Sequence, residues 1–243
     1  MASLLCFSVC AVAQTADELV DKNLQAKGGL EKIRAIKSMR MTAVLDAGGF
    51  KVDLGQESER PNLLRQTVSL QGMTQVTAYD GNAGWQIDPF QGRKDPEMVG
   101  DEQLRSLVED ADFDGPLVDA QAKGNKIEYI GHDQVDGDDV YKLKVTLKNG
   151  DIFYYSLDPD TYIEIQIEKQ RYVRGAVRES VTLLGSYKPV NGVMFPFSIV
   201  SGPKNNPEAG GKVTVQKIEA NVTLDDKDFK MPAALESPKT GSK

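Results

Sequence analysis

The chain has 243 residues, of which 40% are hydrophobic and 27% are charged, and its formal net charge is −7 at pH 7. This length suits one large domain or two small ones. The negative charge argues against a nucleic-acid binder, because phosphate binding needs a basic surface. No run of about 18 apolar residues is present, so we expect no membrane-spanning helix.

The first residues, MASLLCFSVCAVAQ, are apolar from Leu4 to Val12 and contain the small-residue pattern Ala-Val-Ala. This pattern predicts a signal peptide over residues 1–13, cleaved after Ala13, and therefore export of the mature chain. The alternative is a buried first strand or an N-terminal helix. Both cysteines, Cys6 and Cys10, lie in this segment. The mature chain would then have no disulfide and no thiolate metal site.

A helical pattern follows from Asp17 to Ile36, and Gly28-Gly29 interrupts it. Short alternating runs with glycine-containing turns then predict antiparallel strands over 39–46, 50–58, 63–70 and 74–80. A region rich in Gly, Pro and Asp comes next, followed by a predicted helical segment over residues 101–122. Strand patterns then resume over 127–135, 139–147, 151–159, 162–173, 177–190, 193–201 and 212–223.

About eleven strands in two blocks, with one helix before them and two short helices between them, predict an α+β fold. We expect a strongly curved antiparallel sheet whose apolar inner face is covered by the helices. The joint at Gly28-Gly29 would let the first helix turn into this curve, although a simple helix C-cap has the same signature. We expect a single domain and a flexible tail over residues 232–243.

Catalytic and metal-binding motifs are sparse. His132 is the only histidine, and without a GxSxG motif an exposed, solvated side chain is favoured over a Ser-His-Asp triad. The sequence DADFDG at 110–115 matches the opening of an EF-hand calcium loop, but position twelve is Gln121 where a glutamate is required. The alternative is an acidic helix end in which Asp114 caps the next helix. No carboxylate pair stands out as glycosidase-like. We therefore expect no cofactor, no metal and no enzymatic activity.

The aromatic residues are more informative. Trp85, the only tryptophan, and Phe90 lie in the Gly- and Pro-rich region, and further aromatic residues occupy the later strands. Aromatic residues at alternating strand positions most often belong to a core. A large curved sheet under few helices, however, leaves an interior that side chains do not fill, which favours an apolar cavity.

Several segments, in order, resemble the outer-membrane lipoprotein-sorting (LolA-like) superfamily, and most closely its poorly characterised bacterial branch. They are AKGGLEKIRAIKSMRM, YDGNAGWQIDPFQG, ADFDGPLVDAQAKG, YKLKVTLKNGDIFYYSLDPDTYIEI, YKPVNGVMFPFSI and LDDKDFKMP. The resemblance implies an incomplete β-barrel of about eleven antiparallel strands, with helices covering its concave apolar face, as a single domain over 14–231. Members of the superfamily hold acyl chains of lipoproteins or other lipids during transit across the periplasm.

The resemblance also implies a strand arginine that ties a closed lid by hydrogen bonds, and Arg40 and Arg65 are the candidates here. A convincing lipobox is missing, because Val9 precedes Cys10 where a small residue is expected. A soluble carrier is therefore favoured over an anchored receptor.

These observations predict a periplasmic carrier or binding protein for lipid-like ligands, held in an apolar cavity. The helical segment 101–122 would act as the gate. Its partners would be lipids or lipoprotein acyl chains and proteins of the inner and outer membranes, and it would be a monomer. The predicted lining or lid residues are Trp85, Phe90, Leu107, Phe113, Leu117, Tyr141, Leu143 and Val145.

Two other functions stay open. The first is a non-enzymatic interaction or structural module that uses the same half-barrel with a filled core. The second, ranked last, is a hydrolase or calcium-dependent enzyme that would lose activity on mutation of Asp110 and Asp112.

Overall fold

The computed structural model describes residues 14–233. The predicted signal peptide over 1–13 lies outside the described residues, as does all but the start of the predicted tail over 232–243. No helix in the described range is long and apolar enough to cross a membrane.

Two helices, α1 (Ala16–Ala26) and α2 (Leu30–Ala35), open the described chain. α1 begins with a capping box, in which the Thr15 hydroxyl accepts from the backbone N–H of Glu18 while the Glu18 carboxylate accepts from the backbone N–H of Thr15. Gly28 and Gly29 have φ values of +119° and +90°, which residues with a Cβ rarely adopt. They end α1 and turn the chain into α2, so the predicted break is confirmed.

Within residues 14–233, thirteen strands form one antiparallel sheet in the order β6-β5-β4-β3-β2-β1-β15-β14-β11-β10-β9-β8-β7, and β12 and β13 form a separate pair. In chain order their bounds are β1 Ser38–Ala47, β2 Phe50–Glu59, β3 Leu63–Leu70, β4 Met73–Tyr79, β5 Gly84–Ile87, β6 Glu97–Met98, β7 Lys126–Val135, β8 Asp138–Thr146, β9 Ile152–Leu157, β10 Glu164–Val173, β11 Ala176–Gly185, β12 Lys188–Val190, β13 Val193–Phe195, β14 Ser198–Pro203 and β15 Lys212–Ala220.

The predicted α+β fold with one large antiparallel sheet is confirmed, although the sheet has more strands than the expected eleven. The additional strands, β5 and β6, lie in the Gly- and Pro-rich region, in which the sequence predicts no strand. β5 is only four residues long, and it forms because its backbone pairs with β4 from Val76 to Tyr79. Such short strands depend on a neighbouring strand for their hydrogen bonds, so their local sequence only weakly predicts that they form.

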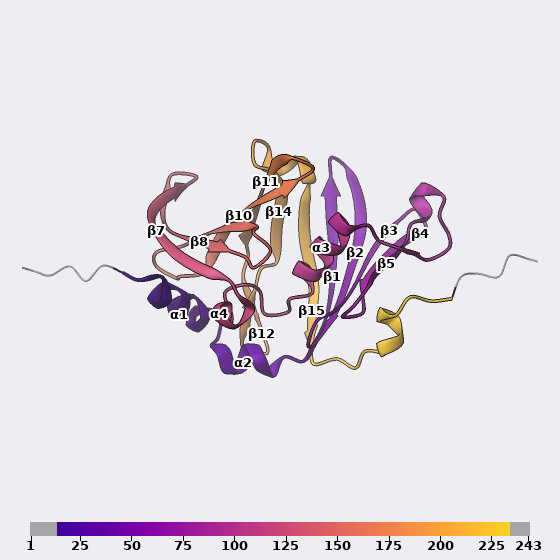
Figure 1. The fold of residues 1–243 in the computed structure, drawn as a ribbon, viewed down its shortest axis with the longest axis horizontal. Coiled ribbons are helices and arrows are strands. Elements are labelled where there is room, and N and C mark those ends of the chain that lie inside the picture. Colours follow the sequence, from indigo (N-terminus) through magenta and orange to yellow (C-terminus); the bar gives the residue numbers. More distant parts are fainter. Residues whose placement is uncertain (1–13, 234–243) are drawn as a thin grey trace, which may run out of the picture.

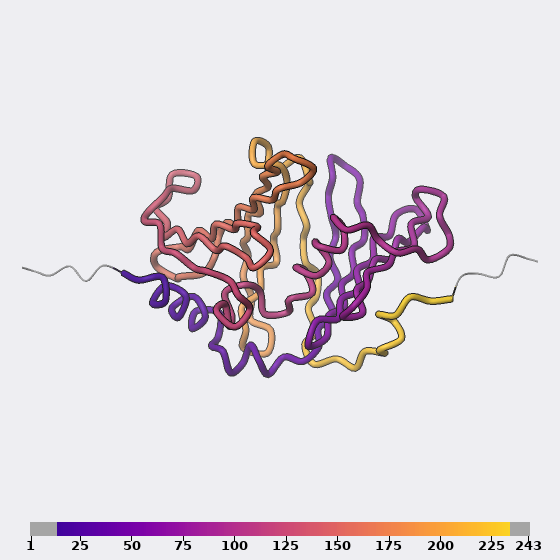
Figure 2. The backbone as a smooth tube through the Cα atoms, viewed as in Figure 1, coloured from indigo at the N-terminus to yellow at the C-terminus, as the bar shows by residue number. Residues whose placement is uncertain are grey.

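The sheet is open and strongly curved, and the remaining helices lie inside the curve (Figures 1 and 2). α3 (Asp101–Asp110) packs on β3 and β4 through Leu107, which contacts Leu64 and Tyr79 in one buried cluster. The opposite side of α3 bonds to Lys169 on β10. Five strands separate β3 from β10 in the sheet, so the sheet must bend around α3 for both to reach it.

The two faces of the sheet differ in chemistry. Directly paired residues of antiparallel strands lie on the same face, and the face alternates along each strand. The face beneath α3, which is the concave face, therefore carries half-buried apolar side chains across its central strands. They are Met41, Leu54, Val68, Leu184, Ile199 and Ile218. The convex face carries charged side chains in the same strands, such as Arg40, Glu57 and Lys217.

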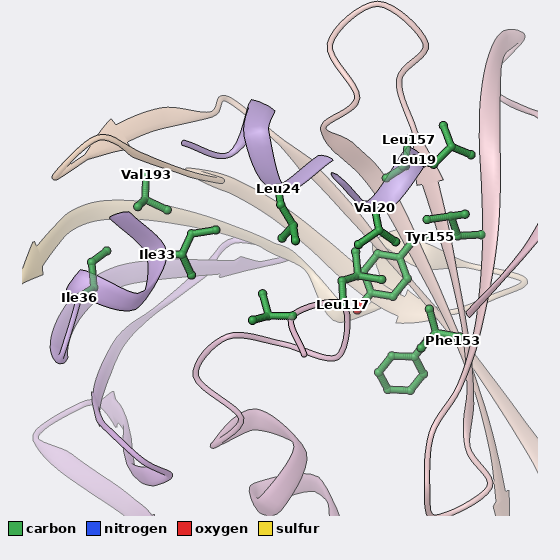
Figure 3. Close-up of a cluster of buried hydrophobic side chains, with 13 residues drawn as sticks. Leu19, Val20, Leu24, Ile33, Ile36, Leu117, Phe153, Tyr155, Leu157 and Val193 are labelled. Carbon is green, nitrogen blue, oxygen red and sulfur yellow. The ribbon is translucent and has the colours of Figure 1, made fainter. Parts of the chain in front are cut away.

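A second buried cluster fills the concave face at β8 and β9, where α1 and α2 pack against it (Figure 3). α1 contributes Leu19, Val20 and Leu24, and α2 is followed by the buried Ile36. Phe153, Tyr155 and Leu157 on β9 face these helices. This half of the concave face is a filled core, whereas the central strands are covered less completely.

Candidate functional site

α3 crosses the concave face and is held on both sides. Its apolar side is anchored by Leu104, Leu107 and the adjoining Ala111, which pack with Leu64 and Tyr79. This arrangement follows from the helical spacing of the apolar residues, which places them on one side of the helix.

The polar side of α3 forms an ion-pair network with β10 and the β8–β9 turn. The Glu109 carboxylate accepts from Lys169 Nζ at 2.5 Å and also pairs with Arg171. Arg171 donates to the Ser106 hydroxyl at 2.9 Å. Arg105 pairs with Asp151, whose side chain is 1% exposed. These contacts bind the two halves of the curved sheet together through one helix.

The loop after α3, residues 111–119, forms three further ion pairs, of which Arg34–Asp119 is the most exposed. The Arg60 guanidinium donates to both carboxylate oxygens of Asp114 at 2.6 Å, and to the backbone carbonyl of Ile36 at 2.7 Å. Lys123 Nζ donates to the two oxygens of Asp112 at 2.5 and 2.8 Å. Arg60 also lies 4.7 Å above the ring of Phe113. The loop is therefore held over the concave face by these charged contacts and by Leu117 and Val118, which are buried in the cluster around α1 and α2.

These pairs bear on the calcium interpretation of DADFDG. Two of the carboxylates that an EF-hand loop would direct at the ion, Asp112 and Asp114, are already neutralised by Lys123 and Arg60. Among residues 14–233 no group of three or more His, Cys, Asp or Glu side chains has the arrangement of a metal site. The alternative interpretation, an acidic helix end followed by a turn, is confirmed, because α3 ends at Asp110. Its capping residue is wrong, since α4 (Ala120–Lys123) has Asp119 and not Asp114 at its N-cap.

Two cavities lie on either side of loop 111–119. The inner cavity, about 270 Å³, lies between the loop and α1–α2. The outer pocket, about 630 Å³, lies between α3 and the β8–β9 turn. Asp112 and Pro116 line both, so the loop is the wall between them. The apolar lining of the inner cavity consists of Leu24, Ile33, Ile36, Phe113, Leu117, Val118, Tyr155, Ile167, Val193, Met194, Phe195 and Pro196.

The inner cavity also contains one buried acidic group that anchors α1. The Glu164 carboxylate, 7% exposed, pairs with Lys27 Nζ at 2.6 Å and accepts from Asn23 Nδ2 at 2.8 Å. Burial acts to raise the pKa of Glu164, but the charge of Lys27 and the two hydrogen bonds outweigh it and hold that pKa below its usual value. Burial, with the negative charge of Glu164, raises the pKa of the Tyr187 hydroxyl, which donates to the Glu164 carbonyl.

The structure brings six of the eight predicted site residues to the concave face, in two groups. Phe113, Leu117, Tyr141, Leu143 and Val145 belong to the cluster around α1 and α2, and Leu107 belongs to the cluster beneath α3. Only Phe113 and Leu117 line the inner cavity. Leu143 and Val145 are fully buried in the core. Whether any of them touches a ligand stays a prediction.

Trp85 and Phe90 lie apart from these groups. Gly84 faces Leu104 and Leu107 of α3, so the next residue, Trp85, points to the convex face. There its indole N–H donates to the backbone carbonyl of Phe229 at 2.7 Å, in the 3₁₀ turn η3 (Asp226–Phe229). Phe90 is 39% exposed in the 3₁₀ turn η1 (Pro89–Gln91).

The placement of Trp85 leads to a prediction for its fluorescence. Because the indole is 4% exposed and lies on the face opposite the cavities, we expect a blue-shifted emission maximum that does not change when lipid is added to saturation. A matched reporter is Phe113→Trp in a Trp85→Phe background, whose emission should change with the same lipid. A lipid-dependent shift of the Trp85 emission would place ligand on the convex side instead.

Several residues at the cavities were not predicted from the sequence. Arg60, Lys123 and Glu164 give no local motif, because their partners lie 11 to 137 positions away in the chain. The candidate lid arginines, Arg40 and Arg65, instead pair with Glu57 on the convex face at 2.8 and 3.3 Å. They do not contact α3. The strand arginine that does bond to the helix is Arg171.

Comparisons with known proteins agree with this architecture at the level of fold. No protein-family model matches the chain, and no curated protein matches it in sequence. Among solved structures, a DUF1329 family protein from Desulfovibrio piger is 13% identical, with a TM-score of 0.59 over 90% of this chain and 98% of that one. A LolA superfamily protein from Nitrosomonas europaea is 14% identical, with the same TM-score and coverages.

A third structure, a domain assigned to outer-membrane lipoprotein sorting from Vibrio parahaemolyticus, is 14% identical with a TM-score of 0.51 over 86% of this chain and 97% of that one. Identities this low show a shared fold and no more. The chain therefore has the LolA-like fold that its sequence resemblance implies.

Proposed function

We propose that this protein is a periplasmic carrier or binding protein for lipid-like ligands, and that an acyl chain occupies the inner cavity behind loop 111–119. The observation that carries the proposal is this partly open space with mostly apolar walls, set in the concave face of a LolA-like sheet. Burial of an acyl chain there would be favoured by roughly 0.8 kcal/mol for each methylene removed from water.

The outer pocket supplies a place for the polar end of such a ligand. Its apolar part is formed by Leu104, Val108 and Leu147, and its edge by charged side chains. Lys148 is the cation at this edge that forms no ion pair within residues 14–233. A ligand whose chain lies in the inner cavity and whose head group reaches Lys148 would pass beneath loop 111–119.

Loop 111–119 must therefore move for the ligand to enter. Its Arg60–Asp114 ion pair is partly buried, since these two side chains are 21% and 13% exposed. Removing the charge of Asp114 weakens the closed state but leaves the apolar walls intact. Each 1.4 kcal/mol lost from the closed state raises the open population about tenfold.

The test is the rate at which wild type and Asp114→Asn take up a fluorescent fatty acid, measured by stopped-flow fluorescence. We expect the variant to take up the probe about tenfold faster. The matched control is Glu97→Gln, which removes another arginine-paired carboxylate, that of the more exposed Arg93–Glu97 pair outside loop 111–119, and should leave the rate unchanged. Native mass spectrometry of protein isolated from cells, followed by extraction, would identify the natural ligand.

Two results would contradict this proposal: the first would contradict the carrier function, and the second would contradict the gate. The first is a ligand-free mass together with no probe uptake by either protein, which would favour the interaction module with a filled core. The filled cluster around Leu143 and Val145 already gives that alternative a structural basis. The second is equal acceleration by both variants, which would remove loop 111–119 as the gate.

A further inference from the structure

The tip of the β10–β11 hairpin extends beyond the neighbouring strands β9 and β14 as a two-stranded ribbon, one face of which bonds to α3 through Arg171. Pairing of β10 with β9 ends at Gln170, and pairing of β11 with β14 ends at Ser180. Beyond these points, residues 171–178 pair only with one another in the described part of the chain. We call residues 171–178 the hairpin tip.

The hairpin tip exposes apolar side chains on one of its faces. Tyr172 and Val177 pair directly across the two strands and are 67% and 61% exposed. Single exposed apolar residues are ordinary on protein surfaces, but a cross-strand pair this exposed at the end of a projecting ribbon is not. A tyrosine ring with its polar hydroxyl suits the interface between lipid and water.

The charge of the hairpin tip is opposite to that of the chain. Its sequence, RYVRGAVR, holds three arginines and no acidic residue, in a protein of net charge −7. Arg171 and Arg178 stand directly opposite one another in the register, which is unfavourable for like charges. Arg171 is neutralised by Glu109, but Arg178 has no ion pair within residues 14–233. The Arg174 side chain is 89% exposed and 3.7 Å from Glu102.

Another exposed apolar residue lies at the same edge of the sheet. Phe50, 66% exposed, follows the β1–β2 turn. The register joins Asp46 to Lys212, Lys212 to Val200 and Pro203 to Ser180, so the β1–β2, β14–β15 and β10–β11 connections leave the sheet on one edge. Figure 2 shows these three connections together at the top of the view.

We propose that this edge, led by the hairpin tip, binds the surface of a lipid bilayer that contains anionic lipids. Tyr172, Val177 and Phe50 would enter the interfacial layer, while Arg174 and Arg178 would contact lipid phosphates. The inference rests on the proposed carrier function in one respect: a lipid carrier must meet a membrane to load or unload.

The test is co-sedimentation of the full chain with phosphatidylcholine vesicles that contain or lack phosphatidylglycerol. We expect the wild type to bind the anionic vesicles, and added salt to weaken that binding. Tyr172→Ser/Val177→Ser and Arg174→Gln/Arg178→Gln should each reduce binding about tenfold or more. The controls are Ile130→Ser, an exposed apolar residue on β7, and Lys126→Gln/Lys217→Gln, two exposed lysines elsewhere.

Fatty-acid uptake and thermal unfolding of the same variants separate this inference from the proposed function. All four variants should keep wild-type uptake and stability. Wild-type uptake with no vesicle binding would overturn the membrane inference alone, as would vesicle binding that the hairpin-tip variants retain. Binding that depends on the hairpin tip, in a protein with no uptake, would support this inference and refute the carrier function.

Discussion

Replacing Gly28 with alanine should destabilise the protein by about 3 kcal/mol, because the added methyl group brings both backbone strain and a steric clash. Gly28 has φ of +119°, and a Cβ there would lie 2.1 Å from the carbonyl oxygen of Gly192. That oxygen belongs to the backbone of the β12–β13 turn, which is held in place because Met194 donates to the Lys27 carbonyl at 2.9 Å. Neither Gly28 nor Gly192 can move aside without breaking the contact between α1 and the β12–β13 hairpin.

The control for this substitution is Gly131→Ala on β7. Gly131 also has a positive φ, of +107°, but a Cβ at this position would have no atom within 4 Å, so only backbone strain of about 1 kcal/mol is expected. Urea denaturation of the two variants measures the difference. Equal losses of stability would mean that the close approach to Gly192 contributes nothing.

The second large effect should come from Lys27→Met, at about 2 to 3 kcal/mol of unfolding free energy. The substitution leaves the Glu164 carboxylate buried, with Asn23 as its remaining side-chain partner. An unpaired charge in such a place is costly because water cannot solvate it. Because α1 is held to β10 by this group, we also expect α1 to lose protection against amide hydrogen exchange first.

Lys126→Met provides the comparison for Lys27→Met. Lys126 pairs with Glu128 at 3.0 Å, but the two side chains are 71% and 39% exposed, so the change in stability should stay within about 0.5 kcal/mol. A further variant, Lys27→Met/Glu164→Leu, removes both charges and should recover part of the loss. Failure of Lys27→Met to destabilise more than Lys126→Met would show that Glu164 does not need its partner.

The lipid-binding hypothesis now depends on a smaller set of residues than the sequence suggested. Phe113 and Leu117 wall the inner cavity, whereas Tyr141, Leu143 and Val145 pack into the core beside it. Loop 111–119, in place of the whole segment 101–122, is the gate that we propose, because both cavities border it. α3 itself is tied down by apolar contacts on one side and by Glu109 on the other.

Local sequence was sufficient for the elements whose stability is local. The helical pattern from Asp17 to Ile36 and the strand pattern over 139–147 predict the pair α1–α2 and the strand β8. Both are confirmed because they depend on residues a few positions apart. The break at Gly28-Gly29 could be found in the same way, since a positive φ favours glycine wherever the chain turns.

Only the tertiary structure determined to which face of the sheet each side chain points and which charged side chains form ion pairs. The sequence predicts that Trp85 lines the cavity. The pairing of β5 with β4 instead directs its side chain to the convex face, where it donates to the carbonyl of Phe229. Arg60 meets Asp114 across 54 positions, and Lys27 meets Glu164 across 137. Such contacts arise only when a curved sheet brings distant strands to the same helices. Sequence by itself thus determined the longer helices and strands, whose patterns are local, but not the short strands β5 and β6. Curvature determined the cavities, because curvature is a property of the whole sheet.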